Sequence, residues 1–447
     1  MHEFSHNARR LFALSVPIML GSAGQNLIAL TDSLFLYGYD ENDFAAVGFI
    51  SVFYLVLTGI GFGFSKGGQI LIARKFGENA FDFVNKYFYS ILFFEAVLGL
   101  LLFFALKFFG PQILGIFIKS DIILSKSLAF LDYRLYGLVF SFVGLSFLSL
   151  YMGIGRPKII LIDTVFLGVI NLFLCYSFVY GRFGFPEMGI AGAGLASSLA
   201  EGAALLFFVV YMIFDRDLIP FRLKRVSSIA YAEIRYIIKI GVPIMLQSMI
   251  GIASWFVFFS FIEKLGERAL AISNLLRVLY LVFSVPCWGF ASAINTIVSR
   301  SIGRGRERRV LKQVFHSSLI SMAVTALISF PFLIFGRVVL QPLLGGEHGE
   351  VFYEALPYFS LLYLILLVAS FSIIYFNGVS GTGEGVKGLN IQIIGSLAYL
   401  LMAYFSISYP ESLGLKWAWF SEVLYWGVQC ILSWWVLRSG QWYFIKF

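Results

Sequence analysis

Charge is scarce in this chain of 447 residues: charged residues make up 13%, whereas 59% are hydrophobic and the mean hydropathy is +0.86. Such a chain cannot cover its surface with polar side chains, which excludes an ordinary soluble domain. Apolar runs of about 20 residues recur along the whole length, each long enough to cross a hydrocarbon core roughly 30 Å thick. They lack the alternation of β-barrel strands. We therefore predict an all-α polytopic membrane protein.

Cysteine and catalytic motifs are also sparse. The three cysteines, Cys175, Cys287 and Cys430, are far apart in apolar runs and indicate neither a disulfide framework nor a metal site. The chain has no phosphate-binding GxxxxGK[ST] loop; the letters of HExxH occur at 2–6, before the first apolar run, and those of GxSxG occur at 63–67, at the end of the second. Its polar connections are too short for a catalytic domain, which leaves only an intramembrane enzyme as an enzymatic alternative. We expect no enzyme activity and no cofactor, and an ion gradient rather than ATP as the energy source.

Basic residues are distributed unevenly between alternate loops. With both termini placed inside, 22 of the 33 lysines and arginines fall in inner segments and 8 in outer ones. This bias predicts a multi-pass protein of the cell (inner) membrane with both termini cytoplasmic. It also explains the net charge of +8 without nucleic-acid binding. The run at 11–36, which follows Arg9 and Arg10, is too long for a signal-peptide core, so we expect it to be the first span.

About twelve spans are predicted along the chain. They lie at roughly 11–36, 45–66, 88–108, 128–151, 159–180, 190–214, 236–262, 269–298, 313–335, 355–378, 388–408 and 415–437. The longest polar connection separates the sixth span from the seventh. We therefore divide the chain into an N-lobe (1–214), a cytoplasmic linker (215–235) and a C-lobe (236–447).

The two predicted lobes repeat each other. The sequence VPIML at 16–20 returns letter for letter at 242–246, a shift of 226 residues. The same shift relates Arg74 to Arg300 and Lys86 to Lys312. One constant shift through two spans and their basic loop indicates duplication. Two six-helix lobes in tandem form a parallel repeat, which is typical of transporters that alternate access to a central cavity between the lobes.

One carboxylate, Asp32, lies at the end of the apolar stretch 16–32. An acid at this depth costs at least a few kcal/mol, so it indicates a functional site. Gln25 precedes it by close to two helical turns and shares its face. Such an acid can take up a proton on one side and release it on the other when its surroundings change. The alternative is a structural aspartate held by hydrogen bonds between helices.

The order Pro17, Gln25, Asp32 resembles the first helix of the multidrug and toxic compound extrusion (MATE) transporters. The sequences at 67–77, 153–158 and 185–196, and Asn171 in the fifth span, are similar to that family as well. The resemblance covers essentially the whole chain. It implies a secondary antiporter that exports organic cations or other amphipathic compounds against inward H⁺ or Na⁺. It also implies that Asp32, with Gln25 and Asn171, takes part in cation coupling.

Two positions depart from the family pattern. Many relatives carry an aspartate four residues after the asparagine of the fifth span, where this chain has Cys175. Some relatives carry a glutamate in the seventh span at the position of Gly251. The ion site therefore lacks two carboxylates seen elsewhere, which leaves the choice between Na⁺ and H⁺ open.

Further polar and aromatic residues in the spans are candidates for the substrate cavity: Lys66, Glu201, Arg277, Tyr37, Trp255 and Tyr280. Lys66, at the predicted end of the second span, could neutralise Asp32 or repel cations, or its long side chain could snorkel to the interface. Glu201, Arg277 and Glu422 could line the cavity or form ordinary interhelical contacts. The aromatic residues could stack on a flat ligand or face lipid.

The main rival function is a flippase for lipid-linked saccharides or other lipids, which share the broader fold. A flippase for anionic cargo predicts a basic cavity, with Lys66 and Arg277 as candidates. In either case we expect a small-molecule substrate in a lipid bilayer, a monomer, no bound metal and no nucleic acid.

Overall fold

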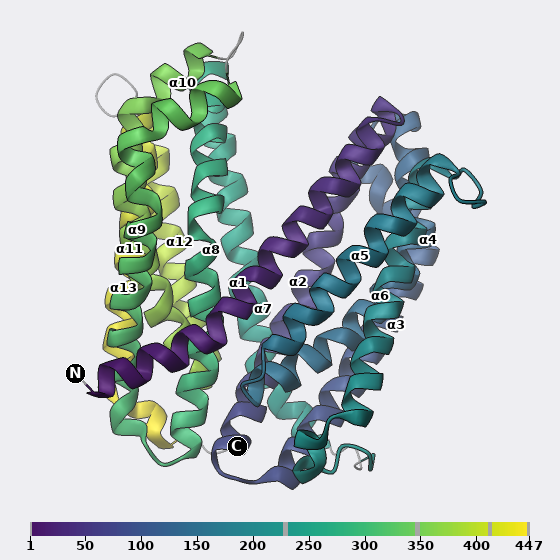
Figure 1. Cartoon of the computed structure of the whole chain (residues 1–447). Coiled ribbons are helices and arrows are strands. Elements are labelled where there is room, and N and C mark those ends of the chain that lie inside the picture. Colours follow the sequence, from purple (N-terminus) through teal and green to yellow (C-terminus); the bar gives the residue numbers. More distant parts are fainter. Residues whose placement is uncertain (1, 227–230, 345–348, 410–413, 445–447) are drawn as a thin grey trace. The chain divides into compact units, whose positions relative to one another are not determined.

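The computed structural model describes residues 2–226, 231–344, 349–409 and 414–444. This part of the chain contains thirteen α-helices and four short 3-10 helices, and no strand (Figure 1). The α-helices are α1 (His2–Tyr37), α2 (Glu41–Gly77), α3 (Phe81–Phe117), α4 (Asp121–Gly153), α5 (Lys158–Tyr180), α6 (Gly189–Phe214), α7 (Tyr231–Glu263), α8 (Glu267–Gly303), α9 (Val310–Leu344), α10 (Gly349–Ala355), α11 (Phe359–Gly381), α12 (Gly385–Ser408) and α13 (Gly414–Ser439).

The helix lengths confirm the predicted all-α polytopic membrane protein. Among the described residues, 10 helices are long and apolar enough to cross a membrane. Helices α1 and α13, with 36 and 26 residues, are long enough to cross as well. The helices extend beyond the predicted spans. In particular α2 continues to Gly77, so the expectation that Lys66 closes this helix is wrong.

The chain forms two compact units that do not follow the order of the sequence. One unit is residues 20–245, and the other combines residues 1–19 with 246–447. Both divisions fall inside continuous helices, after Met19 in α1 and after Met245 in α7, which are equivalent positions of the repeat. The predicted boundaries at 214 and 236 divide the two copies of the sequence repeat, and they stay a prediction. By packing, the first half of α1 belongs with residues 246–447, and the first half of α7 belongs with residues 20–230.

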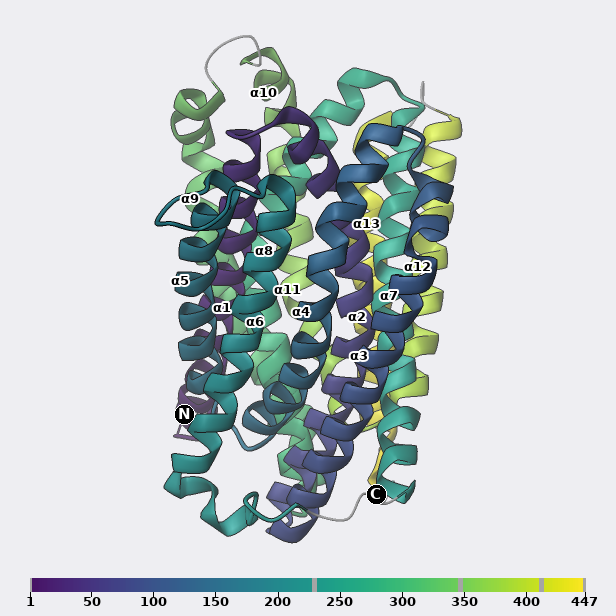
Figure 2. The same cartoon turned by 90° about the vertical axis from the view of Figure 1, so that its right-hand side faces the viewer.

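In the unit formed by residues 20–245, α4 lies between α2, α3 and α6 and is the most buried of the candidate spans (Figure 2). The small residues at the start of α6 explain this packing. A Cβ atom on Gly194 would lie 2.6 Å from the Phe130 carbonyl oxygen of α4, and one on Gly192 would lie 2.7 Å from the Phe178 oxygen of α5. Inside a bilayer, the hydrophobic effect does not drive helices together, because lipid tails are as apolar as the side chains. Close packing of helix backbones at small residues therefore stabilises the association of the spans.

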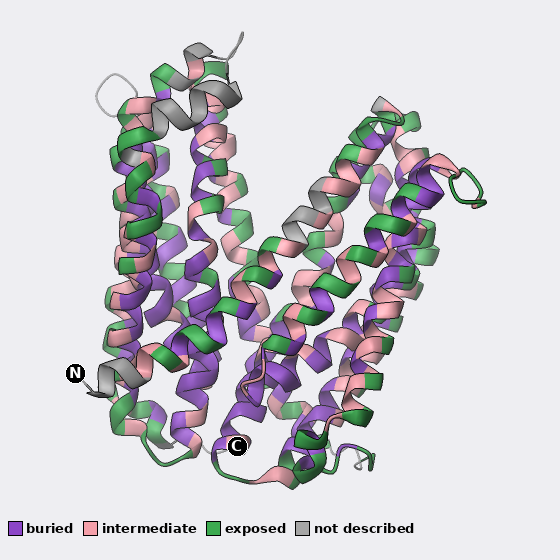
Figure 3. Ribbon diagram, in the orientation of Figure 1, coloured by how far each residue is buried: buried purple, intermediate pink, exposed green. Residues whose placement is uncertain are grey.

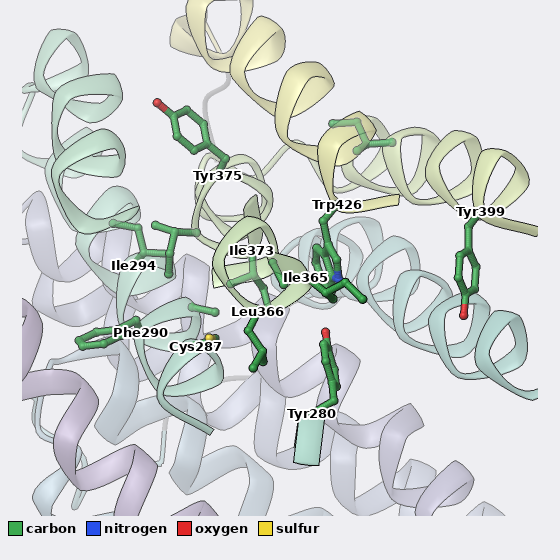
Figure 4. Close-up of a cluster of buried hydrophobic side chains, with 14 of the residues drawn as sticks. Tyr280, Cys287, Phe290, Ile294, Ile365, Leu366, Ile373, Tyr375, Tyr399 and Trp426 are labelled. Atoms are coloured by element: carbon green, nitrogen blue, oxygen red, sulfur yellow. The ribbon is translucent and has the colours of Figure 1, made fainter. Parts of the chain in front are cut away.

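In the other unit, α11 holds the equivalent place between α8, α9 and α13. Its core contains Phe290, Ile365, Ile373 and Trp426, which lie together in Figure 4. A polar contact reinforces the packing of α8 on α11, because Ser299 Oγ donates to the Gly381 carbonyl oxygen at 2.6 Å.

The outward faces of α3 and α5, in the unit 20–245, are more exposed than these cores. Figure 3 shows exposed and half-buried residues along α3 and α5, where large apolar side chains such as Phe104 and Val169 are available to lipid.

In each unit, a glycine of one helix lies against a methionine of another helix, and the two contacts are at equivalent positions of the repeat. A Cβ atom on Gly63 of α2 would lie 2.5–2.8 Å from Cβ, Cα and N of Met245 in α7. At the equivalent crossing, a Cβ on Gly289 of α8 would lie 2.3 Å from Cγ of Met19 in α1. A side chain at either glycine would therefore collide with the helix that crosses it.

The first residues of the predicted linker 215–235 pack against α3. It begins with a 3-10 helix, Arg216–Phe221. Nδ2 of Asn85 then donates to the carbonyl oxygens of Phe221, Arg222 and Arg225 at 3.1, 2.8 and 3.2 Å. One side chain thus satisfies three carbonyl groups that no regular element would pair.

The turn between α1 and α2 is held by charge. Asp40 caps α2 by accepting from the backbone N–H of Asp43, and Lys126 of α4 donates to Asp40 at 3.0 Å and also to Asp43. The Lys126 ammonium group holds the pKa of Asp40 below its usual range. This arrangement ties the end of α1 to the start of α4 within the unit 20–245.

Candidate functional site

Asp32 lies on α1 within the unit 20–245 and faces α5 and α6. Its carboxylate interacts with the Cys175 thiol, the Asn171 amide and the Ser197 hydroxyl. One carboxylate oxygen, Oδ1, is buried and has no hydrogen-bond partner among the described residues. Cys175 thus supplies a weak thiol donor beside Asp32 rather than another negative charge.

Among the described residues, the cation that acts on Asp32 is Arg134 of α4, and it is already paired. Its Nη1 donates to Oε2 of Glu201 at 2.6 Å and its Nη2 to Oε1, a bidentate ion pair between α4 and α6. The guanidinium also lies 4.0 Å from the centre of the Tyr54 ring. A Cβ on Gly137 would lie 2.3 Å from Arg134 Nη1, so glycine makes room for the pair. With side chains only 11% and 14% exposed, this ion pair is largely desolvated.

The net charge of Asp32, Arg134 and Glu201 depends on whether a cation is bound at Asp32. Arg134 acts electrostatically on Asp32 as well as on Glu201. If both acids are ionised, the three side chains carry a net charge of −1, and the bidentate bond belongs to Glu201. A proton or a monovalent cation on Asp32 would make the group neutral. One added positive charge at Asp32 would therefore cancel the net charge of these three side chains.

The other predicted residues of this unit occupy different positions. Asn171 Nδ2 donates to Ser197 Oγ at 3.2 Å, beside Asp32. Gln25 lies in α1, but its side chain is outside the described ones. Lys66 is half-buried inside α2, and the cation that acts on Asp32 within the described chain is Arg134. Tyr37, at the end of α1, is 64% exposed and packs edge-on against Phe44.

A second buried acid occupies the unit that contains residues 246–447. Trp255 Nε1 of α7 donates to Oε1 of Glu422 in α13 at 2.8 Å. Tyr399 and Trp426 are adjacent to the same carboxylate. Glu422 Oε2, the Tyr399 hydroxyl and the Trp426 indole nitrogen are all buried without a hydrogen bond among the described residues. In Figure 4 the hydroxyl of Tyr280 points toward the indole of Trp426.

Two glutamine side chains, Gln392 of α12 and Gln429 of α13, form further hydrogen bonds beside Glu422's helix. Gln392 Nε2 donates to the Tyr425 hydroxyl at 2.9 Å, and Gln429 Nε2 donates to Gln392 Oε1 at 2.9 Å. No cationic side chain is among the described groups that act on Glu422. An ionised Glu422 would thus be uncompensated, so this cluster also has room for one positive charge.

The predicted residues therefore separate into two groups. Asp32, Asn171 and Glu201 come together in one unit, and Trp255 and Tyr280 come together in the other. Arg277 is exposed on α8 and lies over the ring of Phe259 at 5.3 Å, and Phe259 in turn packs against Trp255. No cluster of three or more metal-ligating side chains occurs in the described chain. The assignment of all these residues to coupling or to a cavity stays a prediction.

The structure gives central places to two residues that the sequence does not single out. Arg134 is an arginine within a predicted span, and an arginine and a glutamate within spans of the same lobe are a signal for a buried pair. For Glu422 the sequence leaves a cavity position and an ordinary interhelical contact equally open. What identifies Glu422 is the ring of tyrosine and tryptophan side chains from α7, α8, α12 and α13, which are distant in sequence.

Long apolar helices in two repeated halves, each with a buried acid, define a polytopic α-helical membrane transporter. Residues 17–177 and 243–405 each match the model of the MatE family, and the two matches begin 226 residues apart. The chain belongs to this family, the multidrug and toxic compound extrusion transporters. The repeat found in the sequence is thus two copies of the family's domain.

Known proteins support this membership. The chain is 25% identical over 442 residues to the probable multidrug resistance protein NorM of Thermotoga maritima, covering 97% of this chain and 93% of that protein. It is 27% identical over 308 residues to the probable multidrug resistance protein YpnP of Bacillus subtilis, covering 68% of this chain and 66% of that protein. A solved outward-facing MATE family multidrug resistance transporter has the same fold, with a TM-score of 0.87, 19% identity and coverage of 97% and 95%.

Proposed function

We propose that the chain is a secondary active antiporter that exports organic cations or other amphipathic compounds, driven by inward movement of H⁺ or Na⁺ through alternating access. The observation that carries this proposal is Asp32, whose Oδ1 has no hydrogen-bond partner among the described residues while the nearby Arg134 is committed to Glu201. The relatives named for multidrug resistance support export as the direction of transport.

Binding of one cation at Asp32 would neutralise the group formed with Arg134 and Glu201. A neutral group is less costly in a helix interface closed to water than a charged one. Occupancy at Asp32 would therefore favour one conformation, and release would favour the other. A cationic substrate that displaces the coupling ion would complete the exchange.

The same charge balance bears on the flippase alternative. Both buried groups are deficient in positive charge when their acids are ionised, which suits cationic rather than anionic cargo. Arg277, which the flippase hypothesis needed in a basic cavity, lies over Phe259 instead. We propose transport of small molecules by a monomer in the inner membrane, with both termini in the cytoplasm and no cofactor besides the coupling ion.

The proposal is tested with purified protein in proteoliposomes and a panel of cationic dyes under an imposed pH or Na⁺ gradient. We expect gradient-driven flux in the wild type and its loss in Asp32→Asn, which keeps the side chain's size and removes its charge. Asp132→Asn is the matched control, because Asp132 is exposed and pairs with Lys107 on the surface.

Full flux in D32N would remove Asp32 from the mechanism. Flux of fluorescent lipid analogues instead of dyes in the wild type would favour the flippase. If D132N also loses flux, removal of any carboxylate impairs folding or insertion of the protein, and the loss in D32N is then no evidence for ion coupling.

A further inference from the structure

Glu95 of α3 lies in the unit 20–245 and is completely buried. It is the one charged residue of this helix between Lys86 and Lys107. Both of its carboxylate oxygens have no hydrogen-bond partner among the described residues. An isolated ionised carboxylate in an apolar environment is far more costly than the neutral acid. Glu95 therefore requires a bound positive charge in this packing.

The carboxyl group of Glu95 lies in a seam between α2, α3 and α4. A Cβ atom on Gly61 of α2 would lie 3.3 Å from Glu95 Oε2. The same Cβ would lie 2.6 Å from Cδ1 of Leu145 and 3.1 Å from Cε1 of Phe142, both in α4. The carboxyl group thus meets the α2 backbone at a glycine, beside two apolar side chains.

The polar groups of the two facing helices are not bound to Glu95. In the same seam, Ser65 Oγ donates to the Leu145 carbonyl oxygen at 2.9 Å and Ser149 Oγ donates to the Ser65 carbonyl oxygen at 2.6 Å. The titratable groups nearest to the seam along the facing helices also form no hydrogen bond with either oxygen of Glu95: Tyr54 and Lys66 of α2, and Arg134 and Tyr151 of α4. A metal ion needs several oxygen ligands in place of its hydration shell, whereas a proton needs only the carboxylate.

The turn of α2 beside Glu95 is also the turn that contacts α7. Gly61 faces Glu95, and Gly63, two residues on, lies against the backbone N and Cα of Met245. Met245 is the last residue of this unit, and α7 continues from there into the other unit. A displacement of α2 at Glu95 would therefore change its contact with α7 where the chain leaves the unit.

The other copy of the repeat has no acid at this place. The shift of 226 residues relates Gly61 to Cys287 and Glu95 to Ser321. There Cys287 Sγ and Thr325 Oγ1 form a buried hydrogen bond at 3.2 Å. The packing of these helices is thus compatible with small neutral groups and does not require a glutamate.

We infer that Glu95 is a further proton-binding residue of the proposed antiport, protonated while α2, α3 and α4 are packed as described and deprotonated when this seam opens. The inference rests on the proposed function and assigns H⁺ rather than Na⁺ to this residue. The step is an acid–base equilibrium in which the carboxylate takes up one proton and becomes a neutral carboxylic acid. Release of the proton leaves a charge that has to be hydrated, which separates α2 from α3 and shifts the contact of α2 with α7.

Two measurements on the purified full-length protein test this inference. In the infrared spectrum at neutral pH, we expect the wild type to show the C=O band of a carboxylic acid that Glu95→Gln lacks. In proteoliposomes under an imposed pH gradient, we expect E95Q to lose gradient-driven dye flux at an unchanged Tm. Glu95→Ser, which introduces the residue of the other copy, should lose flux as well, whereas Glu95→Asp keeps a titratable acid and should retain flux with a changed pH profile.

Glu78→Gln is the matched control, because Glu78 is exposed at the end of α2 and pairs with Lys75 at 2.9 Å. It should keep both the infrared band and the flux. An unchanged carboxylic-acid band in E95Q, or normal pH-driven flux in E95Q and E95S, would overturn the inference, as would a wild type driven by Na⁺ alone. Absence of any gradient-driven flux in the wild type would instead contradict the proposed antiport itself.

Discussion

At the scale of single residues, burial decides what an ion pair contributes. Arg134 and Glu201 have side chains 11% and 14% exposed, whereas those of Lys107 and Asp132 are 43% and 60% exposed. An exposed pair is screened by water and contributes about 0–1 kcal/mol. Removing one partner of a buried pair leaves an uncompensated charge, which costs about 3–5 kcal/mol.

We therefore predict that Arg134→Ala lowers the free energy of unfolding by about 3–5 kcal/mol, because Glu201 is then buried without its partner. Lys107→Ala, which breaks an exposed pair involving the same helix α4, should change it by at most about 1 kcal/mol. Thermal unfolding of the purified variants in one detergent measures both. Equal Tm values for the two variants would show that the Arg134–Glu201 pair is not desolvated in the protein.

At the scale of elements, the helix crossings set the closest contacts of the fold. Gly63 and Gly289 are equivalent in the repeat, and each lies against the methionine of the helix that crosses it, Met245 or Met19. The two crossings differ in what a side chain would strike. At Gly63 it would meet the backbone of α7, whereas at Gly289 it would first meet the side chain of Met19, at Cγ.

This difference predicts that Gly63→Ala destabilises the protein by about 1–3 kcal/mol, since the α7 backbone must shift to admit a methyl group. Gly59→Ala is the control within α2. No atom lies within 4 Å of a Cβ at this position, so alanine should be neutral or stabilise the helix by up to about 1 kcal/mol. Chemical or thermal unfolding gives both values, and equal effects of G63A and G59A would contradict the tight crossing.

At the scale of the whole molecule, duplication produced two units with related frameworks and different polar interiors. The central helices α4 and α11 occupy equivalent places, each packed chiefly against three helices of its own unit. One unit contains Asp32 with a paired arginine nearby, and the other contains Glu422 among aromatic hydroxyl and indole groups. Neither Asp32 nor Glu422 forms a salt bridge with a described cation, and the unit 20–245 also buries Glu95 and Asp163 without one.

If Asp32 and Glu422 both take part in ion coupling, Glu422→Gln should lose most of the gradient-driven dye flux while the protein keeps its wild-type Tm. Glutamine keeps the acceptor for Trp255 and removes the charge that exchanges with the coupling ion. Glu267→Gln, an exposed substitution in the same unit, is the control for flux. Normal flux in E422Q would make Glu422 a structural acid and leave Asp32 as the coupling group.

The sequence alone determined the class of the protein. Hydropathy and loop charge are local properties that decide which segments insert into a bilayer and in which orientation, and the repeat is visible as a constant shift in the sequence. It also singled out Asp32, Asn171 and Glu201, since polar groups within apolar runs are conspicuous. The helix ends were less predictable: α2 continues past Lys66 because nothing in the chain breaks the helix where the apolar run ends.

Only the tertiary structure decided which charges meet. Arg134 rather than Lys66 acts on Asp32, and Glu422 is surrounded by aromatic groups from four helices. The halves of α1 and α7 also join units that chain order does not suggest. The physical reason is that a helix fixes which residues share a face, but not which neighbouring helix that face meets. That choice depends on side-chain volume at crossings such as Gly63 and on pairing of buried charges across segments distant in sequence.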